Sequence, residues 1–111
     1  MSDVSGRTNR RLTARHACHF TARYRLGADW HPATAMDLSL RGCRLRLGED
    51  LARGADVTVA LEAPRTPEGR SHEVEVVGQV IWSRREGLSY QVGIHFGDAP
   101  VSLEQILNTV A

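Results

Sequence analysis

The sequence predicts an all-β domain, a six-stranded antiparallel barrel with one short C-terminal helix. Its 111 residues, 41% of them hydrophobic, suit one compact domain and leave no room for a second large one. Short segments in which apolar and polar residues alternate are separated by turn residues, as in half-buried antiparallel strands. Because an open sheet of such strands would expose its edges, closure into a barrel is the economical arrangement.

Six segments carry this alternation. We expect strands at about 20–26, 30–37, 42–47, 57–62, 74–82 and 90–96. In the last of them Tyr90, Val92, Ile94 and Phe96 share one face, which predicts a core-facing side. In the fifth, Trp82 has the same parity as Val80, so we expect both to face the core.

The period changes after the last strand. A stripe at helical spacing predicts an amphipathic helix over about 100–110, formed by Leu103, Ile106, Leu107 and Val110. Ser102 followed by Gln105 resembles a capping box at its start. We expect the helix to lie on the barrel or cover one end of it.

Residues 1–15 differ from the rest of the chain. They are polar and arginine-rich, with too few apolar side chains to offset the entropy of ordering. We therefore expect a flexible arm over 1–15, held in place only by an anionic partner, and a single domain over 16–111.

Composition excludes several classes of function. The net charge is +1, with 14 arginines and no lysine, so a broadly basic surface for nucleic acid is not expected. No apolar run approaches the length of a membrane span, and two distant cysteines indicate a reducing compartment, so we expect a cytoplasmic protein.

Catalytic and metal sites are also not expected. Cys18 and Cys43 share parity with core positions, which favours small buried hydrophobic residues over nucleophiles. His16 and His19 would face opposite sides of a strand and could not converge on one metal ion. The acids are scattered, so we expect no enzyme.

Four arginines lie on the polar faces of the predicted strands, namely Arg23, Arg25, Arg44 and Arg46. We expect them to form cross-strand charge pairs with Glu62, Glu73 and Glu75.

Two clusters remain. The first is Arg10, Arg11 and Arg15, spaced Arg-Arg-x-x-x-Arg, and the second is an Asp-x-Ser-x-x-Gly sequence at Asp37, Ser39 and Gly42. Each alone is ordinary, since arginine pairs are frequent here and Asp, Ser and Gly are common turn residues. Together, in this order and within six predicted strands, they resemble the PilZ domain, the bacterial receptor for cyclic di-GMP. The strands Gly78–Trp82 and Val92–Phe96 support the resemblance.

The resemblance implies a six-stranded antiparallel barrel whose ligand, cyclic di-GMP, is held by Arg11, Arg15, Asp37, Ser39 and Gly42, with Arg10 as an additional contact. The residue types suit that ligand. An arginine fork pairs with phosphate oxygens or with the O6 and N7 atoms of guanine, and a carboxylate accepts the N–H groups on the guanine edge. No cofactor or metal is implied.

This interpretation predicts a receptor whose arm closes over the ligand and which signals through a protein partner, with motility or exopolysaccharide machinery suggested by the family. Two alternatives stay open. One is a PilZ-fold interaction adaptor that binds no nucleotide. The other is a small RNA-binding β-barrel, for which Trp30 is the one exposed stacking platform that the alternation leaves.

Overall fold

The computed structural model describes residues 15–62 and 73–110, with side-chain burial through residue 107. The six predicted strands are present as β1 (His16–Arg25), β2 (Trp30–Leu38), β3 (Gly42–Leu47), β4 (Asp56–Glu62), β5 (Glu73–Glu86) and β6 (Ser89–Phe96). Residues 1–14 of the expected arm lie outside this range, so its flexibility stays a prediction. Residues 63–72, between the fourth and fifth strands, also lie outside it.

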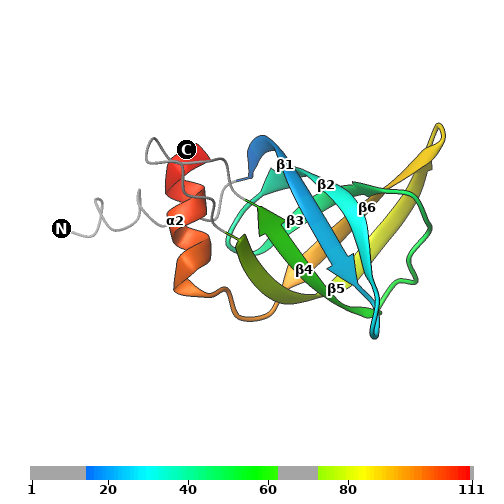
Figure 1. Cartoon of the computed structure of the whole chain (residues 1–111). Helices are drawn as coiled ribbons and strands as arrows, with labels where there is room; N and C mark the ends of the chain where they lie inside the picture. The colour runs from blue at the N-terminus through cyan, green and yellow to red at the C-terminus, as the bar shows by residue number, and fades with distance from the viewer. Residues whose placement is uncertain (1–14, 63–72, 111) are drawn as a thin grey trace.

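The strands close into an antiparallel barrel in the order β1-β2-β3-β6-β5-β4, which confirms the predicted fold class (Figure 1). Within this order, β1 and β4 are neighbours on one side, and β3 and β6 are neighbours on the opposite side. The core is formed by the apolar side chains that alternate along the strands. In β6, Val92, Ile94 and Phe96 are at most 1% exposed, whereas His95, between Ile94 and Phe96, is exposed.

The helix α2 (Val101–Val110) follows β6 and lies against one end of the barrel (Figure 1). Leu103, Ile106 and Leu107 are buried within the barrel's core cluster, so the predicted stripe covers the end of the barrel. The helix begins at Val101, and Leu103 N–H donates to Pro100 O at 3.0 Å. Ser102 therefore lies inside the first turn, and the predicted capping box with Ser102 as N-cap was wrong. No helix in the described part of the chain is long and apolar enough to cross a membrane.

Candidate functional site

The turn between β2 and β3 is held by its own hydrogen bonds. Ser39 N–H donates to Gly42 O at 2.9 Å, and Arg41 N–H donates to the Ser39 hydroxyl oxygen at 3.1 Å. Phe96 N–H of β6 donates to Arg41 O at 2.8 Å. Ser39 is only 3% exposed. Its hydroxyl thus fixes the shape of the turn, as serine side chains often do by bonding to nearby backbone amides.

Gly42 is required by a close approach of two strands. A Cβ at this position would lie 2.1 Å from the backbone oxygen of Ile94 in β6, far inside van der Waals contact. Its φ is not positive, unlike that of Gly27, Gly54 and Gly87. The glycine of the Asp-x-Ser-x-x-Gly sequence therefore lets β3 and β6 pack closely, and it holds the turn between β2 and β3 against the backbone of β6.

Arg15 and Asp37 are brought together by the β1–β2 hairpin. Ala17 and Asp37 are cross-strand neighbours, so the residue that precedes β1 returns to the end of β2. Arg15 Nη1 lies 2.8 Å from Asp37 Oδ1. The Arg15 side chain is 52% exposed and the Asp37 side chain 14% exposed, which leaves most of the arginine open to solvent. Arg10 and Arg11 lie outside the described residues.

Arg44 of β3 joins the same cluster. Its Nε lies 3.2 Å from Asp37 Oδ2, and its Nη1 donates to Gln91 Oε1 at 3.3 Å. The Nε is buried and lacks a directed hydrogen bond, because its N–H is not aimed at the nearby carboxylate oxygen. Asp37 is thus flanked by two guanidinium groups. The expectation that Arg44 pairs with glutamates was wrong, because β3 lies between β2 and β6, away from β4 and the glutamate end of β5.

Trp82 lies on the outer face of the barrel, not in the core as expected. Val80 pairs with the buried Ile94, but the next pair is Trp82 with Gly93, so Ile81 is an extra residue in β5. Such a bulge moves the following side chains to the other face. A Cβ on Gly93 would lie 2.2 Å from Trp82 Nε1, so the indole lies across the glycine. Gly93 inside a strand was the available signal, since interior glycines often mark a bulge or a close approach.

A continuous row of outward-facing residues results, which we call the Asp37 row. Cross-strand pairs connect its members from β2 to β5, namely Asp37, Arg44, Gly93 and Trp82. The guanidinium carbon of Arg84 lies over the Trp82 ring, 5.6 Å from its centroid. The row therefore offers guanidinium groups, one carboxylate and an indole along a single surface.

The two thiols near this row are protonated at neutral pH. Burial, and secondarily the Asp37 carboxylate, raises the pKa of Cys18 to about 11. The same two causes, in the same order, raise the pKa of the fully buried Cys43 even further. Cys43 is buried as expected, whereas Cys18 is half-buried and donates to Ala35 O at 3.5 Å. Neither thiol is placed as a nucleophile.

The arginines of β1 contact Glu73 and the Trp30 ring, whereas Arg44 of β3 contacts Asp37. Arg23 Nη2 lies 2.7 Å from Glu73 Oε1, which confirms the expected pairing for this arginine. Arg23 and Arg25 both lie over the Trp30 ring, each 4.8 Å from its centroid. Because two guanidinium groups already occupy it, Trp30 is a poor stacking platform for RNA bases.

Comparisons with known proteins agree with this architecture. The family model described as PilZ domain matches residues 9–110 of the chain. No curated protein matches the sequence. Among solved structures, a Xanthomonas campestris PilZ protein, described as a tetramer assembled through a helical bundle, has a TM-score of 0.63 at 12% identity, covering 98% of this chain and 93% of its own.

Two longer proteins share the fold. The Bacillus subtilis inhibitor of motility MotI has a TM-score of 0.73 at 11% identity, covering 86% of this chain and 47% of its own. The Borreliella burgdorferi protein PlzA, solved in complex with cyclic di-GMP, has a TM-score of 0.61 at 14% identity, covering 96% of this chain and 43% of its own. This chain thus spans about half the length of these two proteins.

Proposed function

Because this chain belongs to the PilZ domain family, we propose that it is a receptor for cyclic di-GMP that acts through a protein partner. The dinucleotide binds on the Asp37 row and on Arg15, which lies beside Asp37 at one end of that row. The observation that carries this proposal is the 2.8 Å contact between these two residues, since it joins two motifs that are far apart in the sequence.

The charges of the cluster suit a ligand with two phosphates. Arg15 and Arg44 together exceed the single negative charge of Asp37, and Arg15 is half exposed, so a phosphate finds an accessible guanidinium. Asp37 offers acceptor oxygens to the N–H groups of guanine. Trp82, on the same row, provides a flat apolar surface on which a guanine base stacks.

Ser39 and Gly42 act in this proposal through the backbone. Ser39 shapes the turn and Gly42 holds that turn against β6, so both place Asp37 without needing to touch the ligand. Arg10 and Arg11 add contacts from the arm, which closes over the bound dinucleotide. A ligand that contacts only the closed arrangement shifts the population toward it, and the resulting surface is the one a partner protein recognises.

The two tryptophans allow a direct test. Trp30→Phe leaves Trp82 as the sole indole, and Trp82→Phe leaves Trp30. On titration with cyclic di-GMP we expect a change in fluorescence for Trp30→Phe and none for Trp82→Phe, with GMP as the control ligand. Calorimetry on both variants verifies that each still binds.

Absence of any binding of cyclic di-GMP to the wild-type protein would reject the receptor and leave the interaction adaptor. A response from Trp30 in place of Trp82 would move the ligand to the other side of the barrel. A steep loss of affinity for single-stranded RNA with rising salt, together with no binding of the dinucleotide, would favour the RNA-binding barrel.

A further inference from the structure

Gln91 of β6 is buried, although its side chain is polar and lies on the outer face of the barrel. It is 7% exposed, and the other buried polar residue in the described part of the chain is Ser39. Cross-strand pairing sets Gln91 directly beside Arg46 of β3 and diagonally from Arg44. Because a buried amide without a hydrogen bond is costly, the contacts of this side chain indicate its role.

The Gln91 amide is bonded to Arg44. Arg44 Nη1 donates to Gln91 Oε1 at 3.3 Å. Because a guanidinium group has donors only, the amide oxygen is the atom that faces it. The residue directly opposite Arg44 on β6 is Gly93, which has no side chain, so it is the diagonal neighbour Gln91 that reaches the guanidinium from this strand.

Arg44 is thereby held between acceptors on the two neighbouring strands. Its Nε lies 3.2 Å from Asp37 Oδ2 of β2, and its Nη1 is bonded to Gln91 of β6. The Nε–H is buried but is not aimed at the carboxylate, so Asp37 alone does not fix the direction of the guanidinium plane. The hydrogen bond to Gln91 supplies the second contact that orients this planar group.

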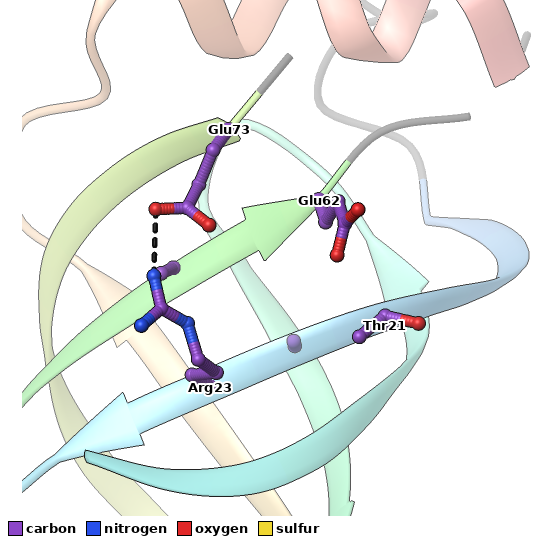
Figure 2. A pocket seen from close by; sticks show the side chains of 6 residues that line it. Thr21, Arg23, Glu62 and Glu73 are labelled. Carbon is purple, nitrogen blue, oxygen red and sulfur yellow. Dashed lines mark hydrogen bonds and ion pairs between the residues drawn. The ribbon is translucent and has the colours of Figure 1, made fainter. Parts of the chain in front are cut away.

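Arg23 of β1 is held by a carboxylate instead of an amide. Figure 2 shows its side chain reaching across to Glu73, where Arg23 Nη2 lies 2.7 Å from Glu73 Oε1. That contact orients the guanidinium and compensates its charge at the same time. The neutral amide of Gln91 orients Arg44 and adds no charge.

We infer that Gln91 is a positioning residue, which holds Arg44 beside Asp37 and leaves a positive charge available to a phosphate of the ligand. The inference rests on the proposed binding of cyclic di-GMP. Arg15, Arg44 and Asp37 together carry one net positive charge. A glutamate at position 91 would also accept from Arg44, but it would cancel that charge, so a neutral acceptor suits an anionic ligand.

The Nε–H signal of Arg44 in nitrogen-15 NMR spectra tests the positioning without ligand. A buried Nε–H exchanges slowly with water, and its cross-peak is identified by its absence from Arg44→Lys. We expect Gln91→Met to shorten the exchange lifetime about tenfold, because a hydrogen bond to a charged group is lost, and Gln91→Glu to retain it. Gln79→Met is the matched control, since the Gln79 amide donates to Gly54 O and not to the cluster.

Calorimetry with cyclic di-GMP tests the consequence for binding. We expect Gln91→Met to weaken binding roughly fivefold, and to cause no further loss when it is added to Arg44→Met, because Gln91 acts through Arg44. Gln91→Glu should bind more weakly than Gln91→Met at low salt, since its carboxylate competes with the phosphate for Arg44, and the difference should shrink as salt rises. Gln79→Met should bind as the wild-type protein does. Thermal melting of every variant verifies that it is folded.

The NMR and calorimetric expectations can fail separately. An exchange lifetime that is unchanged in Gln91→Met would overturn the positioning role. Equal losses of affinity from Gln91→Met in the wild-type and Arg44→Met proteins would also overturn it, because they would show a structural role independent of Arg44. Wild-type affinity in Gln91→Glu would overturn the need for a neutral acceptor. If the wild-type protein does not bind cyclic di-GMP, the receptor is rejected, while the NMR comparison still decides whether Gln91 positions Arg44.

Discussion

The two sides of the barrel carry the same residue types in different arrangements. On the Asp37 row, a carboxylate lies between two guanidinium groups, and Trp82 has one guanidinium 5.6 Å from its centroid. Around Trp30, at the start of β2, two guanidinium groups lie 4.8 Å from the centroid of the indole, and no carboxylate of the described residues forms an ion pair with Arg25. The comparison shows that a tryptophan beside arginines is an available or a covered platform according to how many guanidinium groups lie close over its ring.

The largest expected effect is on the stability of the side that holds Asp37. Gly42→Ala should lower the free energy of unfolding by about 3 kcal/mol or more, because its Cβ would collide with the backbone of β6. Urea unfolding measures the change. Gly48→Ala is the matched control, since no atom lies within 4 Å of its Cβ position and a change within about 0.5 kcal/mol is expected. Equal effects of the two would show that the close approach of β3 and β6 does not matter.

The affinity for cyclic di-GMP should separate the two sides. Arg15→Ala removes a half-exposed guanidinium beside Asp37, and we expect affinity to fall roughly 5- to 150-fold, equivalent to about 1–3 kcal/mol. Arg25→Ala, which removes a guanidinium over Trp30, should leave affinity unchanged. Isothermal calorimetry measures both, and a comparable loss from Arg25→Ala would contradict the proposed site.

A smaller effect is expected when Trp82 is displaced. Gly93→Ala places a methyl group where the indole lies, so Trp82 must move off the strand. We expect a loss of about 1 kcal/mol, roughly fivefold in affinity, together with a shift in tryptophan emission. Gly97→Ala, whose Cβ position meets no atom within 4 Å, is the control. Unchanged affinity despite a shifted emission would remove Trp82 from the binding surface.

The smallest effect concerns the thiol of Cys18. Burial and then the Asp37 carboxylate raise its pKa to about 11 from 9.0, so this group contributes stability below pH 9.0 that is lost as pH rises through about 11. Asp37→Asn removes the second cause, and the pKa of Cys18 should fall modestly. Alkylation of Cys18 in mildly alkaline buffer, followed by mass spectrometry, should be faster in this variant. Glu62→Gln, at the end of β4, should leave that rate unchanged.

Much of the architecture was accessible from local pattern. Alternation predicted the six strands, and helical spacing predicted α2, because both periods follow directly from backbone geometry. The same alternation contains no information on which strands pair. It predicted that Trp82 faces the core as Val80 does, and it predicted that Arg44 pairs with glutamates on strands that are not its neighbours.

The order of residues in this chain was enough to predict a barrel with a terminal helix and to single out Arg15 and Asp37, which prove to be in contact. Only the folded barrel decided which face Trp82 occupies, which acid Arg44 meets and why residue 42 is glycine. The reason is physical: a strand's period is a property of its own backbone, whereas a bulge, a cross-strand neighbour and a close backbone approach exist only once a second strand is paired with it.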